Sequence, residues 1–112
     1  MAMQVDLDHL SGIFRGDRAL VKEWIDLYLE ESPQYFDQLT DARQCGDAQA
    51  MAHAAHDLRP QARYMGCARM HELLAIIEEC AMNDASSCDD QLNELIALRW
   101  TVEAELRTAL QE

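Results

Sequence analysis

A stripe of apolar residues near the middle of the chain is the feature that most constrains its fold. The stripe recurs every three or four positions, so at about 3.6 residues per turn it falls on one face of a helix. Its members are Ala48, Met51, Ala55, Leu58, Ala62 and Met65. Gly46-Asp47 before the stripe and Gly66 after it suit helix boundaries, because glycine favours the left-handed residue past a helix end and aspartate caps the next helix. We therefore predict a helix from about Asp47 towards Met65, whose small side chains allow close packing.

Two helices are expected before this stripe. Apolar residues at helical spacing between positions 7 and 14, followed by Gly16, predict a first helix of about two to three turns. Asp17 can cap a second helix, because its carboxylate accepts from free backbone N–H groups of the first turn. Pro33 either kinks one long helix or opens a new segment, and the sequence leaves both possibilities open. The residues predicted to be buried along this stretch are Leu20, Trp24, Leu27, Tyr28, Phe36 and Leu39.

Two more helices are expected after Gly66. A fourth helix covers roughly residues 67–82, and the polar loop 83–87 follows it, with one of its last residues expected to cap the final helix. The inward positions are Met70, Leu73, Leu74, Ile77 and Ala81, then Leu92, Leu95, Val102, Leu106 and Leu110. No strand alternation competes with this pattern. The sequence thus predicts a single all-α domain over residues 1–112, an antiparallel up-down four-helix bundle with an additional short N-terminal helix.

Charge and hydropathy narrow the choice of partner. The chain has 21 acidic residues against nine Lys plus Arg and a net charge of −12, a balance that repels nucleic acid and anionic lipid. No apolar run reaches the roughly 20 residues of a membrane span, and the N-terminus lacks a signal-peptide pattern. We therefore expect a cytoplasmic protein without membrane insertion, most simply a monomer, that binds another protein or a small molecule. A compact acidic bundle has little room for the enclosed pocket of a metabolic enzyme.

Cysteine and histidine spacing gives little support for a metal centre. His53 and His56 resemble a pair of metal ligands, but they diverge by about 60° around a helix and lack a clear third ligand. Cys67 and His71 form a better-spaced pair on a different helix. A metal-binding bundle is therefore only a weak alternative, and no metal site is predicted. The cysteines form no CxxC pair and are interpreted as small buried hydrophobic residues; they are Cys45, Cys67, Cys80 and Cys88.

His56 is the residue at which we expect chemistry. It lies about a quarter-turn from the centre of the apolar stripe, at the border of core and water, and Arg59 and Arg63 follow on the same edge. If the chain reverses near Gly66, Glu78 reaches about the same level on the next helix. A carboxylate there would hold one ring nitrogen and leave the other as a nucleophile, while the two guanidinium groups would neutralise phosphoryl oxygens. From spacing alone, an ordinary surface histidine beside a solvated edge is the alternative.

The residues around His56 also resemble a known family. Ala55-His56-Asp57-Leu58-Arg59-Pro60, with Met65-Gly66, is similar to the signature of histidine-containing phosphotransfer (HPt) domains. That signature runs histidine, any residue, leucine, lysine, glycine, then an aliphatic residue and a glycine ten positions after the histidine. Leu39-x-x-Ala42-x-x-x-Gly46-Asp47 and Met70-x-x-Leu73-x-x-x-Ile77-Glu78 resemble the family as well. The likeness extends from Asp6 to about Leu110.

The resemblance implies a phosphoryl carrier without kinase activity of its own. Such a domain relays a phosphoryl group between the aspartates of receiver domains in a multistep phosphorelay, downstream of a hybrid sensor histidine kinase. His56 matches the phosphorylated histidine, Arg59 the usual lysine, and Glu78 the residue that hydrogen-bonds the ring. The receiver contributes the aspartate and the Mg²⁺, so the resemblance implies no cofactor held by this chain.

Besides Arg59, which stands for the usual lysine and keeps its charge, two positions depart from the family pattern. Pro60 replaces a glycine and Arg63 a residue that is usually small. Proline lacks the N–H that would bond to the His56 carbonyl, and its ring crowds that carbonyl, so we expect a kink or a widened turn there. The residues expected to border a docked partner are Ala52, Pro60, Arg63 and Gly66. The two departures leave an alternative function, an HPt-like adaptor that docks a receiver or kinase without being phosphorylated.

Overall fold

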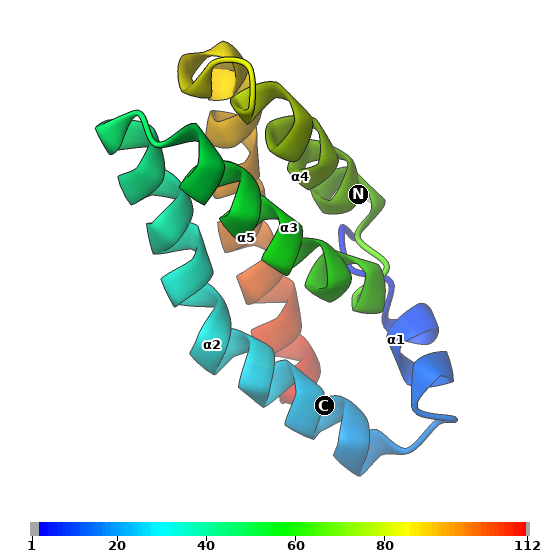
Figure 1. The fold of residues 1–112 in the computed structure, drawn as a ribbon. Coiled ribbons are helices and arrows are strands. Elements are labelled where there is room, and N and C mark those ends of the chain that lie inside the picture. Colours follow the sequence, from blue (N-terminus) through cyan, green and yellow to red (C-terminus); the bar gives the residue numbers. More distant parts are fainter. Residues whose placement is uncertain (1–2, 112) are drawn as a thin grey trace.

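The computed structural model describes residues 3–111, and all regular secondary structure in this part of the chain is helical (Figure 1). Its elements are α1 (Leu7–Ile13), α2 (Arg18–Cys45), α3 (Ala48–Tyr64), α4 (Ala68–Ala81), the short 3₁₀ helix η1 (Ala85–Cys88) and α5 (Asp89–Leu110). The predicted all-α class is therefore confirmed over the described residues.

Helices α2 to α5 share one core. Contacts join α2 to α3, α3 to α4, α4 to α5, and α5 back to α2. Figure 1 shows the chain reversing direction between successive members of this set, with α1 beside the end at which α3 passes into α4. The molecule is elongated, with extents of 42 × 26 × 20 Å, because the long helices lie along one another. None of the described helices is long and apolar enough to cross a membrane.

Capping side chains fix the starts of α2 and α3. The carboxylate of Asp17 accepts from the backbone N–H groups of Ala19 and Leu20, and that of Asp47 accepts from Ala50. Gly46 adopts the left-handed conformation, with φ of 69°, between the two long helices, which suits a residue without a Cβ. These three predicted boundary residues are confirmed.

The prediction for the start of α5 was wrong. Its N-cap residue is Cys88, which makes no side-chain capping bond. The loop residue Asp84 instead caps η1 by accepting from the backbone N–H of Ser86. Because η1 leads directly into α5, the polar loop caps the short helix and not the long one.

Neither proline ends its helix. α2 runs through Pro33 as one helix of 28 residues, which answers the question that the sequence left open. α3 likewise continues through Pro60 to Tyr64. The disturbance expected beside His56 is therefore too small to interrupt α3.

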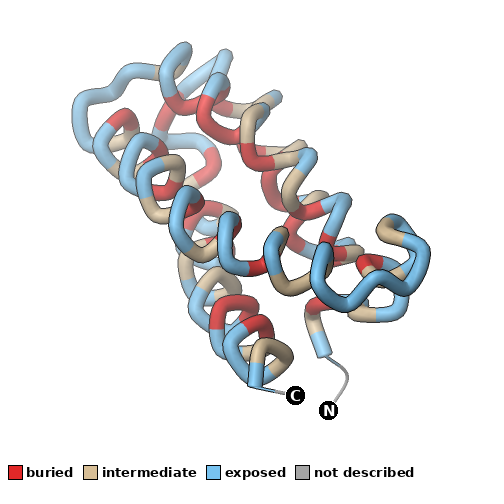
Figure 2. The backbone as a smooth tube through the Cα atoms, turned by 90° about the horizontal axis from the view of Figure 1, so that it is seen from below, coloured by how far each residue is buried: buried red, intermediate tan, exposed pale blue. Residues whose placement is uncertain are grey.

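The predicted core of α3, α4 and α5 agrees closely with the structure. Figure 2 shows buried residues in red recurring along the inward sides of the helices. Every residue predicted to face inward is buried except Ala48 and Leu110, which are partly buried at the ends of α3 and α5. The small residues of α3 let its neighbours pack closely, as the sequence predicted.

The predicted stripe of α2 needs correction in its first half. Leu20 and Leu27 are 43% and 50% exposed. The first half of α2 has apolar residues on more than one face, and Ile25 and Tyr28 are the ones that continue the inward line of the second half. The buried face consists of Ile25, Tyr28, Ser32, Phe36, Leu39 and Ala42.

The four cysteines are free thiols in different surroundings. Cys67 and Cys88 are buried, and Cys80 is partly buried. Cys45 is exposed in the last turn of α2, so its interpretation as a buried residue was wrong. Burial raises the pKa of the Cys67 and Cys88 thiols, which keeps both in the neutral form.

Candidate functional site

His56 and Glu78 meet across the contact between α3 and α4. The Nδ1 atom of His56 lies 2.8 Å from the Oε1 atom of Glu78. The His56 side chain is 65% exposed, whereas that of Glu78 is 27% exposed. The register predicted from the turn near Gly66 therefore places the two residues at the same level.

Arg59 completes a group of three side chains. It lies almost one turn after His56 on α3, and its Nη1 atom donates to the Oε2 atom of Glu78 over 2.7 Å. Both oxygens of the Glu78 carboxylate thus have a partner. The Arg59 side chain is 30% exposed, and its Nε atom is buried without a hydrogen-bond partner among the described residues.

The charge on Glu78 determines the tautomer of His56. Partial burial raises the pKa of the Glu78 carboxyl, but the hydrogen bonds from Arg59 and His56 outweigh burial and leave the pKa below its ordinary value. Glu78 is therefore an ionised acceptor at neutral pH. The proton of a neutral His56 ring must then reside on Nδ1, which leaves the lone pair on Nε2.

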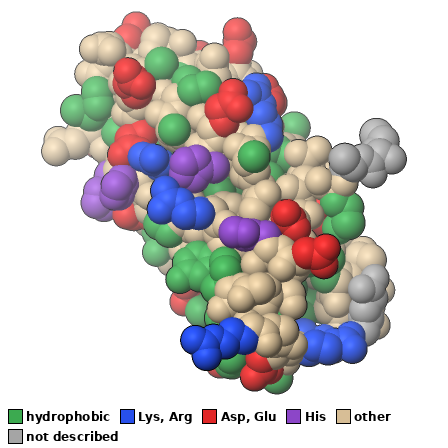
Figure 3. Space-filling model, turned by 90° about the vertical axis from the view of Figure 1, so that its right-hand side faces the viewer, with side chains coloured by type: hydrophobic (Ala, Val, Ile, Leu, Met, Phe, Trp, Pro, Cys, Tyr) green, Lys and Arg blue, Asp and Glu red, His purple; other side chains and the backbone are tan. Residues whose placement is uncertain are grey.

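Arg63 contacts a second histidine. Its Nη2 atom lies 3.3 Å from the Nε2 atom of His71 on α4. Because a guanidinium group can only donate, His71 accepts and is neutral. Burial, followed by the charges of Arg59 and Arg63, lowers the pKa of His71. Figure 3 shows histidine and basic side chains gathered on this face of the molecule.

Gly66 lies against the N-terminal segment. Its φ is 64°, and a Cβ atom at this position would lie 2.7 Å from the Cβ atom of Asp6. The backbone N–H of Asp6 donates to the Met65 carbonyl over 2.8 Å, and the Nε2 atom of His9 donates to the Arg63 carbonyl over 3.0 Å. The close approach of α1 therefore accounts for a glycine at position 66.

The other residues predicted to border a partner differ in exposure. Pro60 and Arg63 are exposed on α3, whereas Ala52 is buried and offers little surface. Gly66 is partly buried beneath the N-terminal segment.

Sequence reasoning missed an apolar surface on α2 and α3, which we call the aromatic patch. Leu20, Leu27 and Tyr64 are its exposed members. The rings of Trp24 and Tyr64 have centroids 5.9 Å apart, which joins the two helices at this surface. Tyr64 lies one turn after Pro60 on α3. The surplus of apolar residues in the first half of α2 was the available signal.

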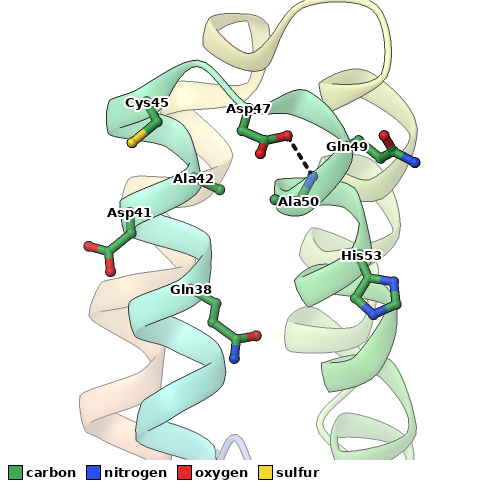
Figure 4. A pocket seen from close by; sticks show the side chains of 8 residues that line it. All are labelled: Gln38, Asp41, Ala42, Cys45, Asp47, Gln49, Ala50 and His53. Atoms are coloured by element: carbon green, nitrogen blue, oxygen red, sulfur yellow. Dashed lines mark hydrogen bonds between the residues drawn. The ribbon is translucent and has the colours of Figure 1, made fainter.

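A hollow at the turn between α2 and α3 lacks the features of a binding site. Figure 4 shows that its side chains point in different directions, with Cys45 and Asp41 on one side and His53 on the other. The Nε2 atom of His53 lies 3.3 Å from the Oδ2 atom of Asp57, one turn further along the same helix. Within the described part of the chain, no group of three or more His, Cys, Asp or Glu residues could hold a metal ion.

Comparison with known proteins identifies the family. The family model of the Hpt domain matches residues 23–112, a span that includes His56, Arg59 and Glu78 and leaves α1 outside. The chain therefore belongs to the Hpt domain family, whose members act in histidine phosphotransfer with receiver domains in two-component phosphorelays. Neither the curated proteins nor the solved structures gave a match.

Proposed function

We propose that this protein accepts a phosphoryl group on the Nε2 atom of His56 and relays it between the aspartates of receiver domains. The observation that carries the proposal is the 2.8 Å contact between His56 Nδ1 and Glu78, which leaves Nε2 unpaired among the described residues. Family membership supplies the reaction class. α2 to α5 would then be the antiparallel four-helix bundle expected of the family, with α1 as the additional short helix.

The proposed reaction needs no general base on this chain. The Nε2 lone pair of His56 attacks the phosphorus of the receiver's aspartyl phosphate, a P–N bond forms, and the bond from phosphorus to the aspartate oxygen breaks. The leaving group is the aspartate carboxylate, and the proton on Nδ1 stays where it is. The imidazole ring gains positive charge, which the Glu78 carboxylate stabilises. Transfer to the next receiver is the same step in reverse, with Mg²⁺ and the aspartate belonging to the receiver.

We further propose that a receiver docks over the exposed edge of α3 and the adjoining aromatic patch. His56, Pro60 and Arg63 are all exposed along that edge. The exposed apolar side chains of Leu20, Leu27 and Tyr64 would be covered by the partner, which favours association. The His56 side chain is 65% exposed in the free protein. A receiver docked over it would therefore exclude water from the ring.

The test is transfer of labelled phosphate from a phosphorylated receiver domain. Wild type is expected to gain an acid-labile, base-stable label, and His56→Gln to gain none. His53→Gln is the matched control, because His53 lies on the same helix and is 75% exposed. No label on wild type despite binding would support the adaptor function, and undiminished label on His56→Gln would overturn the assignment of His56.

A further inference from the structure

Arg59 occupies the position of the family's lysine, but its guanidinium group contacts another side chain of the site. Its Nη1 atom donates to Glu78 Oε2 over 2.7 Å, while the other oxygen of that carboxylate faces His56 Nδ1 over 2.8 Å. α3 therefore supplies two of the three side chains and α4 supplies the one between them. The three form one continuous chain of hydrogen bonds.

The second hydrogen bond restricts the motion of Glu78. A carboxylate held only by the imidazole can still rotate about its side-chain bonds. A planar guanidinium group on the second oxygen removes much of that freedom, because its donors have fixed directions. The stem of Arg59 is itself held, since the side chain is only 30% exposed and its Nε atom is buried. The position of Arg59 thus sets the position of Glu78.

The charge of Arg59 matters as much as its shape. Partial burial acts to protonate Glu78, and Arg59 provides the largest opposing contribution, which keeps the Glu78 pKa below its ordinary value. A protonated Glu78 could donate to Nδ1 instead of accepting from it. The ring proton would then reside on Nε2, and the lone pair would face away from a receiver. Loss of Arg59 therefore weakens the preference for the tautomer that can accept a phosphoryl group.

We propose that Arg59 is a positioning residue that acts through Glu78 to hold His56 in the Nδ1–H tautomer with Nε2 free. This role rests on the proposed function for its biological meaning, but the tautomer itself is a property of the unphosphorylated protein. It differs from the role predicted from the sequence, in which Arg59 neutralises phosphoryl oxygens directly.

Nitrogen-15 NMR of the imidazole rings tests the proposal in the full-length protein, at a pH at which the rings are neutral. Wild type is expected to show a protonated Nδ1 and an unprotonated Nε2 at His56. Arg59→Ala should raise the Nε2–H fraction several-fold, and Arg59→Lys, which keeps the charge, should restore most of the wild-type ratio. Arg63→Ala is the matched control, because Arg63 contacts His71 and not Glu78. A wild-type ratio in Arg59→Ala would overturn the proposal. Arg59→Gln serves the same comparison should Arg59→Ala fail to fold.

Transfer rates distinguish this proposal from the proposed function. If Arg59 acts through Glu78, Arg59→Ala should slow transfer by about 10–100-fold in the wild-type background and by much less in a Glu78→Ala background, in which residue 78 can no longer contact Arg59 or His56. Equal slowing in both backgrounds would show that Arg59 acts directly on the phosphoryl group, which overturns the inference and leaves phosphotransfer intact. If Arg59→Ala shifts the tautomer but wild type takes no label, the positioning role of Arg59 stands and the proposed phosphotransfer function is overturned.

Discussion

The Glu78 carboxylate has one oxygen on His56 and the other on Arg59, while the ring of His56 is mostly exposed to water. At the scale of residues, the candidate site therefore consists of two hydrogen bonds to Glu78 beside an exposed imidazole ring. No enclosed cavity is needed, because phosphoryl transfer depends mainly on alignment and on charge neutralisation. A docked partner can cover the exposed side of the His56 ring.

The first prediction concerns Glu78. Glu78→Ala should slow phosphoryl transfer by about 10–100-fold, the range typical of losing a residue that orients a metal-bound imidazole through its second nitrogen. The helical content measured by circular dichroism should not change, since the lost side chain is only partly buried. Glu79→Ala is the control, because Glu79 is the exposed neighbour on the same helix. Equal transfer rates in wild type and Glu78→Ala would remove Glu78 from the site.

The pairing of His56 with Glu78 could be predicted because it depends on register. The two residues lie at similar separations from the turn at Gly66, ten positions before it and twelve after it, so counting residues along two antiparallel helices was sufficient. The partner of Arg59 could not be predicted in the same way. A long side chain can reach several neighbours. The helical pattern fixes the backbone position of Arg59 but not the group that its guanidinium contacts.

At the scale of elements, α3 connects the site to the rest of the molecule. α4 supplies the partner of His56, and α1 is attached at the C-terminal end of α3 through Asp6 and His9. Two further backbone N–H groups, those of Gln4 and Val5, donate to Glu105 of α5. The N-terminal segment thus joins α3 to α5, although the family match begins only within α2.

The second prediction concerns Gly66. Gly66→Ala should lower the free energy of unfolding, because an alanine in the left-handed region costs about 1–2 kcal/mol and its Cβ atom would also clash with Asp6. Gly46→Ala should carry only the first cost, since a Cβ atom there has no neighbour within 4 Å. Urea denaturation of both variants separates the two effects. If the two variants lose the same free energy of unfolding, the contact between Gly66 and the N-terminal segment contributes nothing to stability.

The helices differed in how well sequence predicted their faces. α3 and α4 have one apolar stripe each, so their buried residues could be read from spacing. The first half of α2 has apolar residues on several faces, and its predicted stripe included Leu20 and Leu27, which are exposed. A surplus of apolar residues predicts that some of them are exposed, but it does not show on which face of the helix the exposed ones lie.

At the scale of the whole molecule, the net charge of −12 has two opposing effects on stability. Unpaired carboxylates repel one another, so acidification relieves repulsion. A carboxylate paired with an arginine stabilises the fold while it is ionised, so acidification removes that stabilisation. Hydrogen bonding to Arg43 holds the pKa of Asp89 below its ordinary value, and hydrogen bonding to Arg69 does the same for Glu94.

The third prediction concerns pH. A carboxylate whose pKa is lower in the folded than in the unfolded state stabilises the fold above the unfolded pKa, and this stabilisation is lost as pH falls through the folded pKa. Asp89→Asn should therefore be less stable than wild type at pH 7, with a difference in urea midpoint that shrinks as the pH falls below the ordinary aspartate range of about 4. Asp90→Asn is the control, because Asp90 lies in the same first turn of α5. A difference that grows on acidification would contradict this account.

The central claim is that the phosphoryl group resides on the Nε2 atom of His56. After transfer from a phosphorylated receiver, NMR of the nitrogen-15-labelled protein can identify the phosphorylated nitrogen directly through its coupling to phosphorus. We predict phosphorus on Nε2 of His56, with Nδ1 still protonated and hydrogen-bonded to Glu78. Phosphorus on Nδ1 of His56, or on His9, His53 or His71, would contradict the account.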